Sequence, residues 1–405
     1  MEEATRRDIT VLDTGQFAML SQARHQAHTK EASMRRTLSA VVVAVALALT
    51  HSSATAPARA QAGSERFGLG MFKVQDRTFV GLVMRYPTEP QQIGGVVVEM
   101  PPAAKAAGQT GIPGDVMSII EQWDSVGPRV RQIVAHAAPL IDRGRPAYIH
   151  DYKAVDALAP LVPRLALYGF GNYRNVLNTP EPVKPRPPAP SIPGLWERSP
   201  NDDRPVNPRV FMIPNTPEVF TGDGDPVIVW HADKRAQYEY ECELAAIVGR
   251  PMRRVPIDQV KNYLFGYTNT NDISDRFGRG ADEWFNDPLL RKGKDSSKPT
   301  GPFIVPAEFV DPLKLRLKMT VGGVLVQDSD TTGAWHNIYE YGAYLSNLIT
   351  VPVGTIIAMG TPPGSHGGLG RFMQEGDIQI CSYEGLGTLT NPIKGEGAPA
   401  KSTLP

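Results

Sequence analysis

Two glutamates one residue apart, Glu241 and Glu243, lead into an apolar run at residues 244–248 that is typical of a β-strand. Side chains at positions i and i+2 of a strand point to the same face of the sheet. Two carboxylates held side by side repel each other unless a cation or bound protons compensate their charge. The spacing therefore indicates a cation site, although a solvated sheet face would carry the same pattern.

A third carboxylate follows downstream, where Asn271-Asp272 ends the run 265–270. An all-oxygen set of three carboxylates suits Mg²⁺, Mn²⁺ or Ca²⁺ rather than zinc or copper. The alternative for Asp272 is an aspartate that stabilises a turn or the start of a helix. We expect Glu241, Glu243 and Asp272 to hold a divalent cation, with Mg²⁺ as the first candidate and Mn²⁺ or Ca²⁺ as the others.

The segment that carries these residues is rich in predicted strands. Its apolar runs lie at residues 227–229, 244–248, 303–305 and 355–359, and amphipathic helices are predicted at 257–264 and 338–348. In the region before it, apolar runs at 79–84 and 96–98 predict strands, and helical spacing predicts helices at 116–123, 130–141 and near 154–161. The expected fold class is α+β and mostly β.

Composition limits the function classes. The 405 residues hold 42 Lys+Arg and 42 Asp+Glu, so no basic excess favours nucleic acid or an anionic membrane surface. The 37 prolines and 38 glycines argue against a helical bundle and for short strands with many turns. Cys242 and Cys381 are the only cysteines, which excludes a disulfide scaffold and a cysteine metal cluster. Two free buried thiols are the favoured expectation, with a single disulfide as the alternative if the protein is exported.

The N-terminal region has the order of a secretory signal peptide. Met34-Arg35-Arg36 leads into an apolar run at 40–49, followed by small residues that include Ala58-Arg59-Ala60 and Ala60-Gln61-Ala62. The apolar run is far shorter than the ~20 residues that span a bilayer. We expect an exported protein, periplasmic or secreted, with Met34 as the true start and no permanent membrane span. The alternative is a disordered tail with a chance apolar patch.

These patterns divide the chain into five expected segments. They are an upstream extension with the signal peptide (1–62), a small N-terminal α/β subdomain (66–178), a proline-rich loop or lid (179–208), the strand-rich domain (209–392) and a C-terminal tail (393–405). The proline-rich stretch can hold neither a helix nor a strand ladder, so it is either a lid over a site or a surface insertion.

A series of ordered motifs lies across residues 209–392. They are Glu239-Tyr240-Glu241-Cys242-Glu243-Leu244-Ala245, Gly266-Tyr267-Thr268 with Asn271-Asp272-Ile273-Ser274-Asp275-Arg276, Lys292 and Asp295 with Pro299-Thr300-Gly301-Pro302, Met359-Gly360-Thr361-Pro362, and Gly376-Asp377 with Gly385-Leu386-Gly387. Together they resemble the motifs of the fumarylacetoacetate hydrolase family. The resemblance implies a mixed, barrel-like sheet in this region, a metal held by the three carboxylates, and a homodimer.

The resemblance also assigns roles around the metal. It implies that Lys292 is a catalytic residue whose fixed positive charge stabilises an enolate or oxyanion. On sequence alone, Lys292, Lys294 and Lys298 would equally form a solvated basic loop. Gly360 and Thr361 resemble a turn that cradles the substrate, and Arg279 stands where the family presents a polar substrate contact.

The proton-transfer half of the family pattern is altered. Gly171-Asn172-Tyr173 opens a motif in which the family carries a histidine general base, but Val176 occupies that position and Asn175 stands where an aspartate is common. Similarly, the F-x-K motif is Phe211-Met212-Ile213 here. His366, close to the cradle turn, is the candidate replacement base, because the ordinary pKa of histidine suits proton transfer near neutrality. Glu375 and Glu181 are other candidates, and an exposed surface histidine is the alternative for His366.

The resemblance implies chemistry on a small-molecule 2-oxo or diketo acid. The preferred function is divalent-metal-dependent hydrolysis of a C–C bond in such an acid. The first alternative is a metal-dependent lyase, such as a hydratase, dehydratase or decarboxylase, since water activation is the step that most needs the missing histidine. The second alternative is a periplasmic protein that binds a 2-oxo acid without turnover.

Overall fold

The computed structural model describes residues 65–173, 207–230, 237–276, 287–365 and 369–397, and all of them belong to the unit Arg59–Pro405. The predicted signal peptide and most of the predicted proline-rich loop lie outside the described residues. None of the described helices is long and apolar enough to cross a membrane.

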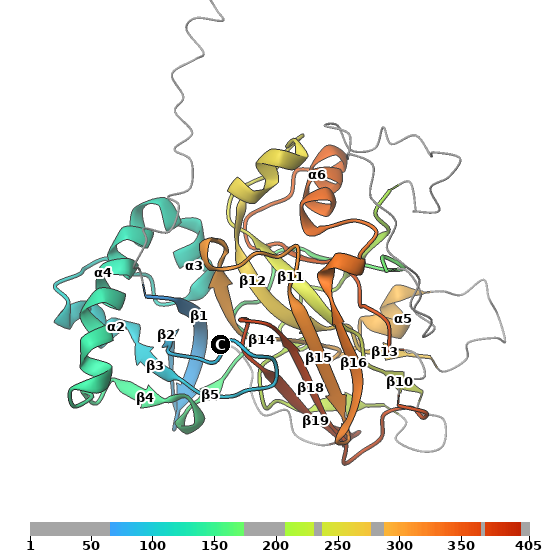
Figure 1. The fold of residues 1–405 in the computed structure, drawn as a ribbon, viewed down its shortest axis with the longest axis horizontal. Helices are drawn as coiled ribbons and strands as arrows, with labels where there is room; N and C mark the ends of the chain where they lie inside the picture. The colour runs from blue at the N-terminus through green and yellow to red at the C-terminus, as the bar shows by residue number, and fades with distance from the viewer. Residues whose placement is uncertain (1–64, 174–206, 231–236, 277–286, 366–368, 398–405) are drawn as a thin grey trace, which may run out of the picture. The chain divides into compact units, whose positions relative to one another are not determined.

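A large mixed sheet organises the described residues (Figure 1). Its strands are β1 (Phe67–Val74), β2 (Arg77–Met84), β3 (Val96–Glu99), β4 (Ile149–Asp151), β5 (Asp156–Ala157), β6 (Ala166–Gly169), β7 (Val210–Ile213), β8 (Phe220–Thr221), β11 (Cys242–Val248), β12 (Leu264–Asn271), β14 (Lys298–Pro306) and β17 (Ile356–Ala358). The main path is β4-β3-β2-β1-β14-β12-β11-β17-β6-β7, while β5 pairs with β1 and β8 with β14.

A second sheet has five strands and packs beside the first (Figure 1). They are β9 (Val227–Val229), β15 (Arg316–Val321), β16 (Val324–Asp330), β18 (Ile378–Tyr383) and β19 (Leu389–Gly395), in the order β16-β15-β18-β19-β9. A two-stranded sheet pairs β10 (Tyr238–Glu239) with β13 (Ser274–Asp275). The predicted α+β, mostly-β class with mixed sheets is confirmed, and within the described residues the strand paths stay open rather than closing into a barrel.

The helices are short, apart from α4. They are α2 (Met100–Ala106), α3 (Val116–Glu121), α4 (Trp123–Asp142), α5 (Pro288–Lys292) and α6 (Ile338–Leu348), with 3-10 turns η1 (Tyr152–Ala154), η2 (Ile257–Asn262), η3 (Ala307–Phe309) and η4 (Thr331–Gly333). The prediction for α6 is confirmed, because Asn337 and Glu340 form a reciprocal capping box at its start. The helix predicted near 154–161 was wrong, since η1 and β5 occupy that region, and the 257–264 helix is the 3-10 turn η2.

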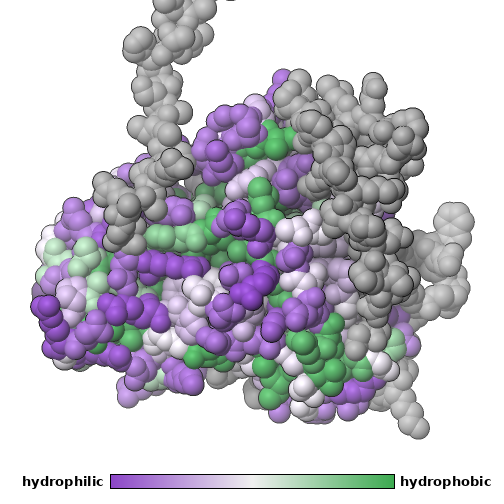
Figure 2. All heavy atoms as spheres, viewed as in Figure 1, coloured by the Kyte–Doolittle hydropathy of each residue, from purple (hydrophilic) through white to green (hydrophobic). Residues whose placement is uncertain are grey.

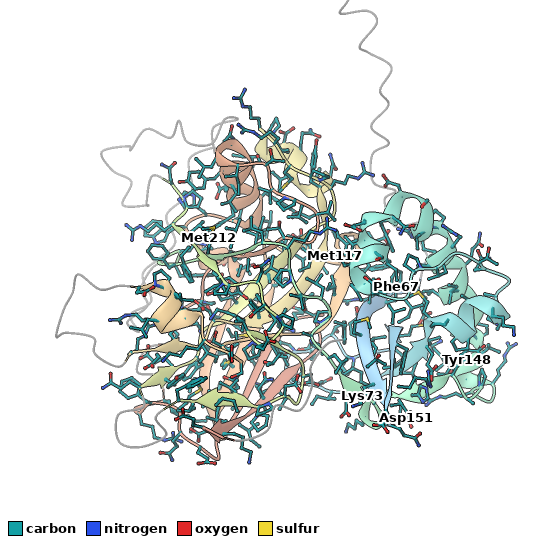
Figure 3. All side chains as sticks on the ribbon, turned by 180° about the vertical axis from the view of Figure 1, so that it is seen from behind. Phe67, Lys73, Met117, Tyr148, Asp151 and Met212 are labelled. Carbon is teal, nitrogen blue, oxygen red and sulfur yellow. A yellow bond between two sulfur atoms is a disulfide. The ribbon has the colours of Figure 1, made fainter. Side chains whose placement is uncertain are left out.

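Helices α2, α3 and α4 lie against the strands at the start of the chain (Figure 1). Ile119 of α3 belongs to the same buried cluster as Ala245 and Ile247 of β11. Met117, labelled with Phe67 of β1 in Figure 3, packs so closely on Gly354 that a Cβ there would lie 2.3 Å from its sulfur. The early helices and the metal-candidate strand therefore share one core.

The face shown in Figure 2 mixes polar and apolar side chains, and the apolar ones gather at its centre and at its lower right. The large sheet ends at β7, where Met212 is 68% exposed (Figure 3). Among the described residues β7 pairs only with β6, so it forms one edge of this sheet.

Cys242 of β11 and Cys381 of β18 are joined in a disulfide. The expectation of two free buried thiols was therefore wrong. Both residues are buried as expected, but the sequence does not show that strands 139 residues apart lie back to back. The bridge connects the large sheet to the five-stranded sheet.

Candidate metal centre

Antiparallel pairing of β11 and β12 brings the three predicted carboxylates together. Cys242 lies opposite Asn271, so the start of one strand meets the end of the other. The Asp272 amide donates to the Glu241 carbonyl at 2.8 Å. One carboxylate oxygen from each of Glu241, Glu243 and Asp272 lies within 4.8 Å of the other two, and all three residues are buried. The spatial prediction for these three side chains is met.

Asn271 holds this junction in place from behind. Its Oδ1 accepts a hydrogen bond from the Glu241 amide at 2.8 Å, and its Nδ2 donates to Gln379 Oε1 of β18 at 2.8 Å. Because Asn271 is fully buried, both bonds are shielded from water. The backbone that carries two of the carboxylates is therefore fixed to both sheets.

The Glu243 carboxylate is buried and only partly hydrogen-bonded by the described residues. Its Oε2 accepts a hydrogen bond from the Gly360 amide at 2.8 Å, whereas its Oε1 accepts none from the described residues. The side chain is completely buried. Burial, with repulsion from Asp272 and Glu241, holds the pKa of Glu243 well above its ordinary value. A buried, unsatisfied carboxylate oxygen facing two further carboxylates fits a hard divalent cation, which is what this donor set prefers.

Lys292, at the end of α5, reaches the same carboxylates as the resemblance implied. Its Nζ lies 3.0 Å from Glu241 Oε2, pairs with Asp272 and lies 5.3 Å from the centre of the Phe211 ring. Burial alone would lower the pKa of Lys292, but the charges of Asp272 and Glu241 outweigh it and the pKa is raised. The ammonium group therefore stays charged near neutral pH.

Lys298 is a site residue that sequence reasoning missed. Its Nζ lies 2.9 Å from Asp272 Oδ1, and both side chains are completely buried. It also donates to the carbonyls of Ser297 and Lys292. Burial lowers the pKa of Lys298, an effect that Asp272 opposes. The solvated basic loop considered for the lysines is wrong for Lys298, and the available signal was its place at the start of the apolar strand β14.

Arg276 is the third cationic side chain beside the carboxylates, after Lys292 and Lys298. It donates to Glu239 at 2.7 Å and pairs with Glu241. It ends the Asn271–Arg276 motif, whose spacing marked Asp272 but gave Arg276 no role. Asp272 and Glu241 thus contact three cationic side chains, whereas Glu243 accepts a backbone hydrogen bond from Gly360.

Gly360 and Thr361 lie beside the carboxylates, where the resemblance implied a substrate cradle. Gly360 has φ +86°, and a Cβ there would lie 3.2 Å from Asn172 Cβ, so glycine is required for its amide to reach Glu243. Thr361 Oγ1 donates to the Cys242 carbonyl at 2.9 Å and lies 2.9 Å from Gln327 Nε2. Both residues therefore fix the carboxylate strand, and their contact with substrate stays a prediction.

Most of the remaining predicted site residues lie in segments that the structure does not describe. Arg279, His366, Val176, Asn175 and Glu181 lie outside the described residues. Glu375 is described, and it is exposed in the turn before β18.

The fumarylacetoacetate (FAA) hydrolase C-terminal family model matches residues 173–394, more than half of the chain, and this range contains every residue of the carboxylate–lysine centre. The chain belongs to the fumarylacetoacetate hydrolase family. The family expectation drawn from the ordered motifs is confirmed. The named relatives and structural neighbours include a tautomerase, isomerases and hydrolases, and the family is one of enzymes.

Relatives with known names differ in their reactions. The oxaloacetate tautomerase YisK of Bacillus subtilis is 32% identical over 288 residues, covering 70% of this chain and 87% of that protein. Maleylpyruvate hydrolase from Sphingobium sp. SYK-6, solved with manganese(II) and pyruvate, has a TM-score of 0.58 at 21% identity and covers 81% of this chain and 99% of that one. A 5-carboxymethyl-2-hydroxymuconate delta-isomerase from Mycobacterium smegmatis has a TM-score of 0.55 at 23% identity, covering 82% and 100%. The two solved structures show the shared fold.

Proposed function

We propose that this member of the family is a divalent-metal-dependent enzyme that moves a proton at the carbon beside the oxo group of a 2-oxo acid. Glu241, Glu243 and Asp272 would hold the metal, with Mg²⁺ or Mn²⁺ as the first choices and Ca²⁺ as a third. The observation that carries the proposal is the Glu243 carboxylate, completely buried among like charges with one oxygen unsatisfied by the described residues.

A divalent cation bound there would polarise the oxo and carboxylate groups of the substrate and stabilise negative charge on the oxo oxygen. The chain's own contribution is Lys292. Its buried ammonium is a preorganised positive charge that needs no rearrangement of water when negative charge develops on the substrate. Arg276 and Lys298 hold Glu241 and Asp272 from other sides and so keep these two carboxylates oriented.

Keto–enol tautomerisation of a 2-oxo acid is the reaction we place first. It needs a metal, a stabilising cation and proton transfer, but no activated water. The histidine usually expected to activate water is replaced by Val176. A relative that is 32% identical over 70% of this chain, YisK of Bacillus subtilis, is an oxaloacetate tautomerase.

Hydrolysis of a C–C bond in a 2-oxo or diketo acid, the function preferred from the sequence, is the second candidate. It adds attack by water to the same charge-stabilising centre, so it needs a base such as His366. The lyase alternative shares the centre without hydrolysis, and a binding protein without turnover would share only the metal and the carboxylate recognition. Homodimer formation and export stay predictions.

The metal proposal is tested by titrating the purified protein with Mn²⁺ and Mg²⁺ in a calorimeter. We expect saturable binding of one ion per chain, and at least ~10-fold weaker binding in Glu243→Gln, which keeps the shape but removes the charge. Glu375→Gln, which removes an exposed carboxylate, is the matched control and should bind like the wild type. Absence of binding to the wild type would refute the proposal.

The reaction is tested with oxaloacetate and a panel of other 2-oxo acids. With Mn²⁺ present, the wild type should convert enol to keto form faster than metal alone does. The loss of enol absorbance measures the rate. Mass spectrometry separates the candidates, since hydrolysis yields two fragments, hydration one heavier product and tautomerisation an unchanged mass. Ligand binding without acceleration of any reaction would leave only the binding-protein alternative.

A further inference from the structure

The disulfide lies at the back of the proposed metal site. Cys242 stands between Glu241 and Glu243, and neighbouring side chains of an extended segment point to opposite faces. The two carboxylates therefore face the site while the sulfur faces β18 and joins Cys381. Both cysteines are buried, so the bridge lies within the packed interior rather than on the surface.

A hydrogen bond links the same two strand regions beside the disulfide. Asn271, the cross-strand partner of Cys242, donates to Gln379 of β18, two residues from Cys381. The Thr361 hydroxyl bonds to the carbonyl of Cys242 from the other side. The peptide that connects the two glutamates is thus fixed by one covalent bond and two hydrogen-bonded neighbours.

We propose that the Cys242–Cys381 disulfide is a positioning cross-link for the metal site, and that full metal affinity requires it. This inference rests on the proposed function. Without the bridge, the start of β11 keeps its hydrogen bonds, its packing and the ion pairs of Glu241 but loses its covalent link to β18, so the spacing of Glu241 and Glu243 is less sharply fixed. Groups that orient metal ligands from behind typically change metal affinity by ~10–100-fold when they are removed.

A required disulfide also restricts the cellular compartment in which the site can form. Closing the bridge breaks two S–H bonds and forms one S–S bond, so an oxidant must accept two electrons and two protons. A small-molecule or protein disulfide, R–S–S–R, does so by exchange and leaves as two R–SH thiols. Such oxidants prevail in secretory and periplasmic compartments, whereas cytosolic thiols are kept reduced. The bridge therefore supports the export predicted from the N-terminal region.

The test is calorimetric titration with Mn²⁺ of the wild type, Cys381→Ala and Leu317→Ala. Cys381→Ala breaks the bridge but leaves the sequence of β11 intact. Leu317→Ala removes a completely buried side chain from the neighbouring strand β15, so it weakens the same sheet without touching the bridge. We expect a ~10-fold or greater loss of Mn²⁺ affinity in Cys381→Ala and less than ~2-fold in Leu317→Ala.

Two results overturn the inference while leaving the proposed function standing: Cys381→Ala binds as tightly as the wild type, or Leu317→Ala loses as much affinity. If the wild type itself binds no Mn²⁺, the proposed function fails and the inference fails with it. The wild type is also titrated after reduction with a phosphine, and again after reoxidation. This comparison tests the bridge even if Cys381→Ala does not fold. Affinity should fall on reduction and return on reoxidation, and an unchanged affinity in verified dithiol protein contradicts the proposal.

The compartment is tested by producing the full chain in a bacterium and counting the free thiols of the protein. Denaturation in a maleimide reagent adds two labels to the dithiol and none to the disulfide, which intact mass resolves. We expect unlabelled protein in the extracytoplasmic fraction. Two labels on protein from that fraction would overturn this part of the proposal.

Discussion

Lys298 Nζ lies 2.9 Å from Asp272 Oδ1, with neither side chain exposed to solvent. An isolated buried charge is strongly unfavourable, and a buried pair tolerates the loss of one partner poorly. The proposed metal ligand Asp272 is thus held by two lysines, since Lys292 pairs with its other oxygen. This arrangement leads to the first prediction.

Lys298→Met should lower the free energy of unfolding by about 3 kcal/mol, because Asp272 loses its only fully buried cationic partner among the described residues. Urea denaturation without added metal measures the loss. Lys294→Met removes the partly exposed pair with Asp275 and should lose about 1 kcal/mol or less. Equal losses in the two variants would show that burial of the Lys298 pair has no special effect.

The stability of the metal-free protein should fall as pH rises through the pKa of Glu243. The folded-state pKa lies above the ordinary value, so the contribution of Glu243 is fully present below the unfolded pKa and is lost once the buried carboxyl ionises. Glu243→Gln removes this dependence, because an amide does not titrate. The measurement is the difference in melting temperature between the two proteins across acid to neutral pH, and a constant difference contradicts the prediction.

Metal binding should release a proton in the same pH range. The bound cation favours the ionised form of Glu243, whereas the metal-free protein favours the neutral form. Titrations in buffers of different ionisation enthalpy count the protons released, and Mn²⁺ affinity should rise with pH. A proton count of zero below the raised pKa would be incompatible with Glu243 as a ligand.

Gly360→Ala should weaken Mn²⁺ binding and lower stability by about 1–2 kcal/mol, because alanine strains at φ +86° and its methyl group would press on Asn172. Gly370 has φ +72° with open space around it, so Gly370→Ala carries similar backbone strain without the contact. Calorimetry with Mn²⁺ should find normal affinity in Gly370→Ala and reduced affinity in Gly360→Ala. Normal affinity in both variants would mean that the Gly360 amide does not orient Glu243.

Breaking the disulfide should lower the free energy of unfolding by about 5 kcal/mol. The bridge closes a segment with a sequence separation of 139, and a loop of that length loses much of its conformational freedom in the unfolded chain. Denaturant titration of Cys381→Ala against the oxidised wild type measures the effect. A loss below about 1 kcal/mol would show that residual structure already constrains the unfolded chain.

The parts of the fold that the sequence predicted are those governed by local rules. The helix at 338–348 carries its own capping residues, and the strand at 227–229 is bounded by turn residues, so both were located correctly. The helix expected near 154–161 failed because β5 takes its hydrogen bonds from β1, more than 80 residues earlier in the chain. Such a partner is invisible to local spacing.

The site residues also fall into those marked by local sequence patterns and those that depend on packing. Glu241, Glu243 and Asp272 were found because strand periodicity and ordered motifs mark them. Lys298 was missed because its importance comes from burial against Asp272, which depends on the packing of β14 beside β12. The disulfide likewise depends on a second sheet lying behind β11, and no spacing between two cysteines encodes that.

The pairing of Cys242 with Asn271 makes the centre sensitive to insertion and deletion. Adding one residue before Leu244 would turn each side chain of the segment to the opposite face, placing a sulfur where an oxygen ligand belongs and a carboxylate against β18. An insertion or deletion at the start of β11 should therefore remove the site even where every residue type is kept.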